Sequence, residues 1–369
     1  MTKLIAIYLP QYHEIEENNK WWGKGHTEWT SCKKAKRLFK DHYQPRIPLN
    51  NNYYDLTDRE AQLEQVKLAK QNGIYGFCYY HYWFEGKMLL EKPMENMLHD
   101  KEIDMPFCIS WANHTWTNSI NKRGRKVLIE QTYGDKEDWE NHFNYLKKFF
   151  KDKRYIRVND KPVMVIYNAK DIECWEEMKS TWDEMAVNEG FKGIHYVNTL
   201  KDEQDIDYSN KYRFDAQFEY QPTFALRKRN KLEYNSWYYL KRILYKDFIN
   251  KPCICNYDRV WRNVIDNTPS NDIVTYLGSY SDWDTTARWG NKGIVHKGAN
   301  PQKFKKYLKQ QITRSKTMNE SEFIFITAWN EWSEGAYLEP DEKYKYKYLE
   351  VIKEAIYECD NNINNIDRR

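Results

Sequence analysis

The sequence predicts a (β/α)8 barrel, a TIM barrel of α/β class built as a single domain with elaborated loops after its strands. Eight short apolar runs recur along the 369 residues, and stretches with helical periodicity separate most of them. Such runs are typical of parallel strands buried on both faces, and eight strand–helix units suggest closure into a barrel. The length also suits an elaborated barrel, which extends from roughly 200 to more than 400 residues. We expect the barrel to occupy residues 1–359 and a polar C-terminal tail to occupy 360–369.

The eight runs follow one another in a regular order. They lie at residues 4–9, 74–80, 106–111, 162–167, 194–198, 214–218, 273–277 and 323–327. Helices are expected at 59–71, where Asn72-Gly73 is a common helix stop, and at about 136–151. The Lys-, Arg- and Tyr-rich segment 225–261 is expected to be a helical insertion in the sixth unit. An open doubly wound sheet is the alternative, and the lack of a GxGxxG or GxxxxGK loop after any run disfavours it.

Composition and charge exclude several classes of protein. The net charge is only +4 and the two signs are interspersed, which is not the pattern of a nucleic-acid-binding protein. No run approaches the roughly 18 apolar residues of a membrane span. The first run leads directly into Gln11-Tyr12-His13 without a small-residue cleavage site, so we interpret it as a strand and expect a cytoplasmic protein. The seven cysteines form no C-x-x-C pair and are expected to be reduced thiols.

Polar and aromatic side chains follow six of the runs, at the end of the barrel where active sites of this fold lie. Aromatic residues make up 16% of the chain, and a Tyr-rich core is the simplest explanation of that figure alone. Their position after the strands favours a sugar-binding cleft instead, because sugar rings stack on aromatic side chains. The candidate substrate-binding residues are Tyr12, His13, Tyr80, His81, Tyr82, Trp83, Trp111, Asn113, Trp116, Glu219, Trp283, Asp284, Arg288, Trp329, Asn330 and Trp332.

Two carboxylates three residues apart follow the last run and are the candidate catalytic residues. Glu331 and Glu334 belong to the stretch AWNEWSEGAYLEP, and on a tight turn side chains with this spacing point the same way. Carboxyls that share a dry site divide their pKa values, which supplies the acid and the base that glycosidic cleavage requires. Two glutamates near a helix end are more often surface residues. The surrounding tryptophans and Gly335 favour a catalytic pair here.

These motifs resemble the WbsX-type proteins, whose domain is similar to glycoside hydrolase family 99. The matching stretches are AIYLPQYHEI (6–15), HTEWT (26–30), YGFCYYHYWFEGKMLLEKPMENML (75–98), PFCISWANHTWT (106–117), KPVMVIY (161–167) and TAWNEWSEGAYLEPD (327–341). The resemblance implies a (β/α)8 barrel with retaining, endo-α-mannosidase-like chemistry. It also implies that Glu331 is the base that helps the sugar's own 2-hydroxyl to attack the anomeric carbon, and that Glu334 is the acid/base. WbsX-type proteins are linked to O-antigen and capsular polysaccharide, which implies a bacterial surface glycan as substrate.

Two other functions remain open from the sequence. One is a glycosyltransferase in O-antigen or capsule biosynthesis, and the other is a non-catalytic glycan-binding barrel. Asp282-Trp283-Asp284 has the D-x-D form of a transferase metal site, but it lies in a W-D-x-T-x-R context that resembles a sugar site. His13, His81 and His114 lack the spacing of metal ligands, so no metal or other cofactor is expected. The expected partner is an oligosaccharide or polysaccharide, and the sequence carries no signal for an oligomeric state.

Overall fold

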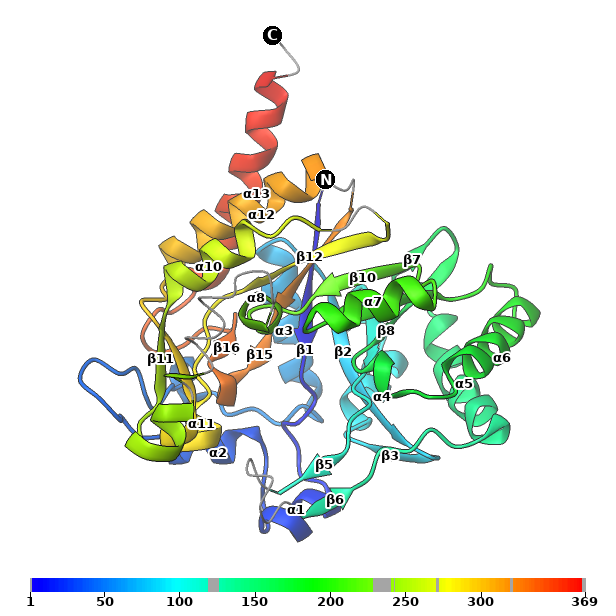
Figure 1. The fold of residues 1–369 in the computed structure, drawn as a ribbon, viewed down its shortest axis with the longest axis horizontal. Helices are drawn as coiled ribbons and strands as arrows, with labels where there is room; N and C mark the ends of the chain where they lie inside the picture. Colours follow the sequence, from blue (N-terminus) through cyan, green and yellow to red (C-terminus); the bar gives the residue numbers. More distant parts are fainter. Residues whose placement is uncertain are drawn as a thin grey trace.

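The computed structural model describes residues 2–118, 126–227, 240–241, 243–269, 272–318 and 321–366. Eight strands pair in parallel around a closed sheet in the order β1-β14-β12-β10-β9-β8-β4-β2, and β2 pairs with β1 to close it (Figure 1). The strands are β1 (Lys3–Tyr8), β2 (Ile74–Phe84), β4 (Phe107–Trp111), β8 (Lys161–Ile166), β9 (His195–Leu200), β10 (Ala216–Glu219), β12 (Val274–Tyr280) and β14 (Phe323–Thr327). Each of the eight predicted runs contributes one of these strands, so the predicted (β/α)8 barrel is confirmed.

Helices connect successive strands and cover the barrel. They are α3 (Arg59–Gln71), α4 (Lys92–His99), α5 (Lys136–Phe150), α6 (Trp175–Asn188), α7 (Glu203–Lys211), α8 (Thr223–Arg227), α10 (Tyr257–Ile265), α12 (Pro301–Met318) and α13 (Lys347–Ile366). Side-chain caps fix where several of them begin. Asp58 accepts the N–H of Glu60 at the start of α3, and Asp135 accepts two N–H groups at the start of α5. The predicted end of α3 before Asn72-Gly73 is confirmed: the helix ends at Gln71, and Gly73 has a positive φ of 85°.

Shorter elements elaborate the loops between strands. Between β1 and β2 lie α1 (Glu16–Trp22), α2 (Glu28–Lys34) and a 3-10 turn, η1 (Leu49–Asn51). Two-stranded ladders are formed by β3 (Lys87–Leu89) with β2, β5 (Trp116–Thr117) with β6 (Val127–Ile129), and β7 (Arg157–Val158) with β8. The remaining turns and short helices are η2 (Ala169–Asp171), α11 (Thr286–Trp289) and η4 (Gly290–Lys292). These elements lengthen the loops from which the site is built.

The segment predicted as a helical insertion is only partly helical where it is described. It contains α8 residues, a π-helical turn, η3 (Leu244–Ile249), and a strand, β11 (Cys253–Asn256), before α10 begins. The strand pairs in parallel with β13 (Ile294–Lys297), and the prediction overlooked it because the run 253–256 is too short to show periodicity. Residues 228–239 and 242 of the insertion lie outside the described part of the chain.

The C-terminal helix α13 packs beside α12 and projects past the barrel (Figure 1). It continues to Ile366, so most of the segment predicted as a polar tail is helical, and Asp360 forms a 2.9 Å ion pair with Lys316 of α12. The limits of the domain stay a prediction. All seven cysteines are free, and six of them are buried. Among the described residues, no helix is long and apolar enough to cross a membrane.

Candidate active site at the mouth of the barrel

Glu331 and Glu334 lie on a tight turn directly after β14. Glu331 ends the short strand β15 (Asn330–Glu331), which pairs with β16 (Ala336–Tyr337), and Glu334 ends the 3-10 turn η5 (Trp332–Glu334) between them. Glu331 is only 5% exposed, and the side chain of Glu334 is 16% exposed. The charge of Glu334 raises the pKa of Glu331, and Glu331 in turn affects the pKa of Glu334, so the two carboxyl groups lie close together. The turn therefore brings together the two residues that the sequence singled out as a pair.

Burial raises the pKa of both carboxyls. For Glu331, the negative charge of Glu334 adds to the effect of burial, while Arg288 opposes it. For Glu334, Arg288 is the main influence that lowers the pKa against the effect of burial. A close pair of this kind retains a proton near neutral pH. Because Arg288 contacts Glu334 directly, the free protein favours the proton on Glu331.

Arg288 lies between Glu334 and a third carboxylate, Glu28. Its Nη1 is 2.6 Å from Glu334 Oε1, its Nη2 is 3.3 Å from Glu28 Oε2, and its Nε donates to the Ser333 hydroxyl at 3.0 Å. Glu28, at the start of α2, is 3% exposed and also accepts the Ser333 N–H at 2.9 Å. The site thus places one guanidinium among three carboxyl groups, and α2 and α11 both hold the turn η5.

Four tyrosines surround Glu331 on the side of β2, β8 and β10. The charge of Glu331 contributes to the raised pKa of Tyr80, Tyr82, Tyr167 and Tyr220, after the larger effect of burial in each case. The Tyr80 hydroxyl donates to that of Tyr220 at 3.4 Å, and Tyr80 also lowers the pKa of Glu331 against the effect of burial. The phenols therefore stay neutral at ordinary pH and offer O–H donors beside the carboxyl pair.

Three of the candidate residues fix the turn rather than face a substrate. Asn330 makes two hydrogen bonds to the backbone of Leu9, at 2.8 and 3.0 Å, and Tyr12 donates to the carbonyl of Asn330. The Trp332 ring stacks on Tyr337 at 3.8 Å and donates from Nε1 to Glu339 at 2.7 Å. These contacts hold β15 and η5 against β1, so they position Glu331 and Glu334.

Asp284 supports the same turn from the strand β12 side. Its N–H donates to the carbonyl of Glu334 at 2.7 Å, and its carboxylate accepts from His42 and Gln44 at 3.0 Å each. Although burial opposes ionisation, the hydrogen bond from His42 and the charge of Arg46 lower the pKa of Asp284 to about 2. Gly335 must stay small, because a Cβ there would lie 2.9 Å from that of Asp284 at φ 65°.

Both aspartates of the D-x-D motif, Asp282 and Asp284, contact other residues of the protein. Arg46 lies 2.8 Å from Asp282 and 3.6 Å from Asp284, and Trp283 between them is 8% exposed. Within the described ranges no group of three His, Cys, Asp or Glu residues is arranged to hold a metal ion. Asp282 and Asp284 tie the loop 42–46 to the barrel.

Three of the predicted aromatic residues lie on the outer side of the barrel wall, away from Glu331. His81 contacts His142 of α5 through its Nε2 at 2.9 Å, and Trp83 stacks on the same His142 ring at 4.5 Å. Trp111 also packs on His142, with ring centres 4.8 Å apart. Alternate residues of a strand face opposite sides, so Tyr80 and Tyr82 face the pair while His81 and Trp83 face α5. The structure therefore does not bring these three residues to the carboxyl pair, and their role in substrate binding stays a prediction.

Four further candidates make contacts in other parts of the protein. Asn113 is fully buried and links two loops through hydrogen bonds with the backbone of Asn168 at 2.8 and 2.9 Å. Glu219 is buried and accepts from Gln221 at 3.2 Å and from Asn267. His13 is buried, and the charges that act on its ring are those of Asp55, Glu91 and Lys92. Trp329 is fully buried and packs on Phe77, at 5.2 Å. None of these contacts places the side chain at the carboxyl pair.

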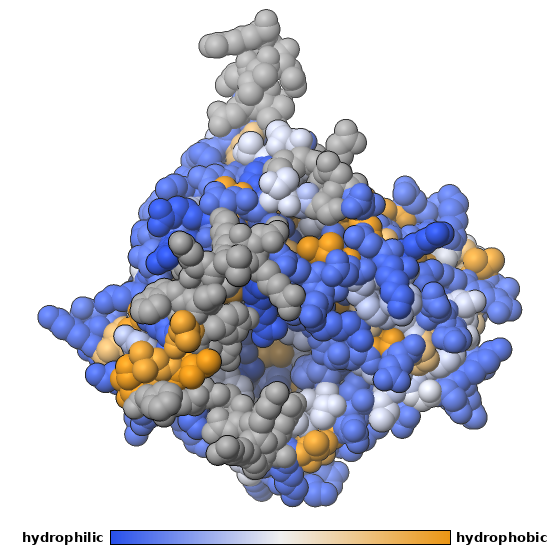
Figure 2. All heavy atoms as spheres, in the orientation of Figure 1, coloured by the Kyte–Doolittle hydropathy of each residue, from blue (hydrophilic) through white to orange (hydrophobic). Residues whose placement is uncertain are grey.

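Trp116 is half-buried and forms an aromatic wall near Tyr82. Its ring lies 5.1 Å from that of Tyr82 and 5.9 Å from that of Trp21, both edge-on. On the face shown in Figure 2 the surface is hollowed near its centre, over the region where β1 and β15 lie in Figure 1. A half-buried indole beside buried tyrosines can stack on a sugar ring.

Sequence reasoning missed four residues of the site. Glu28, His114, Tyr167 and Tyr220 were not among the candidates, although each lies close to the pair or to its tyrosines. Burial lowers the pKa of His114 to about 4, and its ring lies 5.8 Å from that of Tyr167. Tyr167 and Tyr220 come one residue after β8 and β10, which is a usable signal. Glu28 lies in α2, within the long connection between β1 and β2, so a search of the residues that follow strands does not find it.

Comparisons with known proteins agree with this architecture. The uncharacterized protein WxcX of Xanthomonas campestris pv. campestris strain B100 is 31% identical over 362 residues. The alignment covers 96% of this chain and 49% of WxcX, so the chain spans about half the length of the curated relatives that it matches.

Solved structures share the fold at low sequence identity. The GH99 endo-α-mannosidase from Bacteroides thetaiotaomicron aligns with a TM-score of 0.57 at 13% identity, covering 97% of both chains. A glycoside hydrolase-like protein aligns with a TM-score of 0.59 at 10% identity, covering 96% of this chain and 93% of its own. The family described as Glycosyltransferase WbsX matches residues 4–352. The chain belongs to this WbsX family.

Proposed function

We propose that the chain is a carbohydrate-active enzyme that cleaves or transfers α-linked glycans of a bacterial surface polysaccharide. The observation that carries the proposal is the pair of buried carboxyls, Glu331 and Glu334, whose pKa values are both raised, with Arg288 and four tyrosines around it. A module that only binds glycans has no need of an acid and a base in contact. Trp116 beside the pair supplies a surface for a sugar ring.

The roles of the two carboxyls follow the scheme that the family 99 resemblance implies. Glu331 accepts a hydrogen bond from the 2-hydroxyl of the sugar and takes its proton as the 2-oxygen attacks the anomeric carbon. Glu334 gives its proton to the departing glycosidic oxygen. Water, or another glycan, then attacks the anomeric carbon while Glu334 takes its proton, and the 2-oxygen leaves that carbon and regains its proton from Glu331, so configuration is retained. In this scheme the nucleophile is the substrate's oxygen, unlike the common enzyme-carboxylate route.

Substrate binding must move the proton from Glu331, where it lies in the free protein, to Glu334. Arg288 favours the charged form of Glu334 in the free protein, whereas the scheme needs Glu334 protonated. A 2-hydroxyl that donates to Glu331 stabilises the charged form of that residue, since hydrogen bonding to a carboxylate favours ionisation. The proton then passes to the neighbouring carboxyl of Glu334.

The experiment compares the protein with its Glu334→Gln variant on α-linked mannan-type and bacterial surface oligosaccharides, with and without sugar nucleotides. Release of a shorter saccharide by the native protein alone, without a nucleotide, supports a hydrolase or transglycosylase. The second candidate, a glycosyltransferase, is favoured by the family's description as glycosyltransferases. Chain extension only when sugar nucleotides are present would support that candidate and overturn the cleavage scheme.

A further inference from the structure

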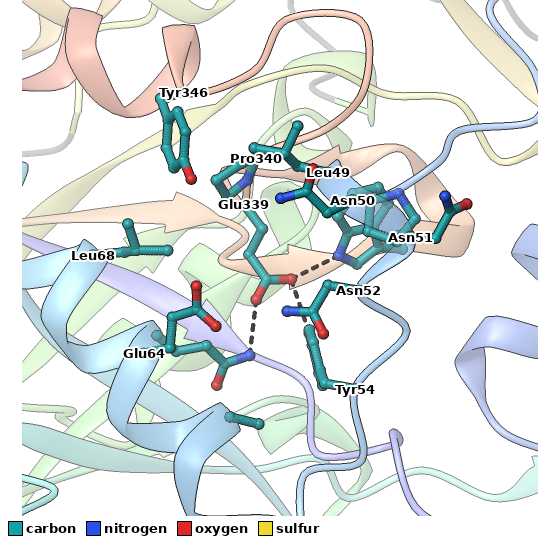
Figure 3. A pocket seen from close by; sticks show the side chains of 14 residues that line it. Leu49, Asn50, Asn51, Asn52, Tyr54, Glu64, Leu68, Glu339, Pro340 and Tyr346 are labelled. Carbon is teal, nitrogen blue, oxygen red and sulfur yellow. Dashed lines mark hydrogen bonds between the residues drawn. The ribbon is translucent and has the colours of Figure 1, made fainter.

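A second pocket lies beside the barrel, between α3 and the segments 48–54 and 339–346. Its volume is about 510 Å³, within the usual range of small-molecule sites of about 300–1,000 Å³. It shares Trp332 with the turn η5, and neither Glu331 nor Glu334 lines it. Figure 3 shows its lining side chains, which come from α3, the loop around η1 and the chain after β16. The pocket is therefore separate from the mouth of the barrel.

A buried carboxyl group forms its floor. Glu339 is 6% exposed and accepts hydrogen bonds from Trp332 Nε1 at 2.7 Å, Tyr54 Oη at 2.8 Å and Gln65 Nε2 at 2.8 Å. All three bonds are drawn in Figure 3. Glu339 lines the pocket, so its carboxyl is a polar group that a hydroxyl of an occupant can contact. Its three neighbours hold this carboxyl in place.

The rim adds more acceptors but no cation. Glu64 of α3 is exposed and points toward the carboxyl of Glu339, and Asn52 lies opposite it (Figure 3). Leu49, Leu68 and Pro340 give the walls an apolar surface. Since none of the described residues that line the pocket is Lys, Arg or His, the pocket repels anions and suits a ligand that donates several hydrogen bonds. Apolar walls with carboxyl and amide acceptors match the C–H faces and the hydroxyls of a pyranose.

We propose that this pocket is a second saccharide site, which takes a neutral, hydroxyl-rich sugar residue and excludes acidic sugars. The ring hydroxyls donate to Glu339, Glu64 and the Asn52 amide oxygen, and the ring packs on the apolar wall. Because Glu339 is bonded to the Trp332 indole, the occupant rests against the turn that carries Glu334. The inference does not depend on the roles of Glu331 and Glu334.

Binding of simple glycosides to the full chain tests the proposal. The probes are methyl α-D-mannopyranoside, methyl α-D-glucopyranoside and glucuronate, titrated by calorimetry up to about 50 mM, since single sugars often bind in the millimolar range. Ala61→Phe fills the pocket from α3, and Glu64→Gln removes the rim charge. Glu60→Gln, on the same helix with an exposed side chain, is the matched control, and Glu331→Gln reports binding at the mouth.

We expect at least one neutral glycoside to bind the native protein, Glu60→Gln and Glu331→Gln equally, and Ala61→Phe and Glu64→Gln at least tenfold more weakly. Glucuronate should not compete. If no probe binds, or if Ala61→Phe binds as tightly as the native protein, the proposal is wrong. Binding lost only in Glu331→Gln would assign the sugar to the mouth and also overturn it. Should Ala61→Phe not fold, Asn52→Ala replaces it; Asn52 has φ −72°, whereas Asn50 and Asn51 have positive φ that alanine disfavours.

Discussion

Arg288 lies 2.6 Å from Glu334, and the same guanidinium also lies 3.3 Å from Glu28. One cation thus balances a group of three carboxyls, of which Glu28 and Glu331 are almost fully buried. Its position opposes the effect of burial on both members of the pair, and Glu28 reinforces that effect. The two residues around Glu334 therefore shift its pKa in opposite directions, which gives two predictions of opposite sign.

Replacing Arg288 with methionine should raise the pKa values of the carboxyl pair. A lost cation favours the protonated forms, so the acidic limb of the kcat/KM profile moves to higher pH. We also expect kcat to fall about a hundredfold, as on loss of one charge-stabilising donor. The pH profile of Arg288→Met is compared with that of Arg262→Met, an exposed arginine of α10. An unchanged acidic limb would show that Arg288 does not control the pair.

Replacing Glu28 with glutamine should have the opposite effect. Glutamine keeps an acceptor for the Ser333 N–H but removes a negative charge that raises the pKa of Glu331 and Glu334. The acidic limb should therefore move to lower pH, by about half a unit or more. Measuring both variants on one substrate is decisive, because a purely structural defect would not shift the two limbs in opposite directions.

Substitutions at two nearby residues of β2 should affect different properties, catalysis in one case and stability in the other. Tyr80→Phe removes a hydroxyl that lowers the pKa of Glu331, so kcat should fall about tenfold or more while the melting temperature changes little. Trp83→Phe removes the 3.0 Å bond to Asp138 and the stacking on His142, so it should cost about 1–3 kcal/mol of stability and leave kcat unchanged. Kinetics and thermal melts of both variants check this. A large loss of kcat in Trp83→Phe would mean that the outward-facing side contributes to the site.

The stability of the chain should fall between about pH 4.5 and pH 7 through Glu339. Burial raises the pKa of its carboxyl to about 7, so folding favours the protonated form. A raised carboxyl pKa gives stability that is full below the unfolded value and lost as pH rises through the folded value, on the order of 3 kcal/mol in this case. Melting curves from pH 5 to pH 8 measure it. Glu339→Gln should melt lower at pH 5 and show a flatter pH dependence, whereas Glu60→Gln should follow the native curve.

The barrel could be predicted because its signal is local. Most of the strands lie in apolar runs of four or more residues, and β2 is so fully buried that the side chains on both of its faces belong to the core. The strand β11 gave no such signal, since its four residues are too few to show periodicity. Helix α13 shows the reverse case. Its last residues are polar, and their helical state follows from the apolar turns that precede them.

The site was harder to predict than the fold because it depends on the side of the strand to which each side chain points. The sequence places Tyr80, His81, Tyr82 and Trp83 together after a strand, but only the register decides which of them face Glu331. Asn330 and Asp284 have the chemistry of sugar ligands, yet both are used to hold the catalytic turn. Glu28 reaches the site from a helix more than 300 residues away from Ser333. Such contacts follow from tertiary packing, and the spacing of residues in the sequence does not predict them.

The most direct test of the central claim compares Glu331→Gln and Glu334→Gln on two forms of the same saccharide. One is the α-linked oligosaccharide that the native protein cleaves, and the other is the corresponding α-glycosyl fluoride, whose leaving group departs without protonation. If Glu334 is the acid and Glu331 the base, Glu334→Gln should no longer cleave the oligosaccharide but should still release fluoride from the glycosyl fluoride. Glu331→Gln should lose both activities. Equal losses of fluoride release in the two variants, or full activity of either on the oligosaccharide, would contradict the account.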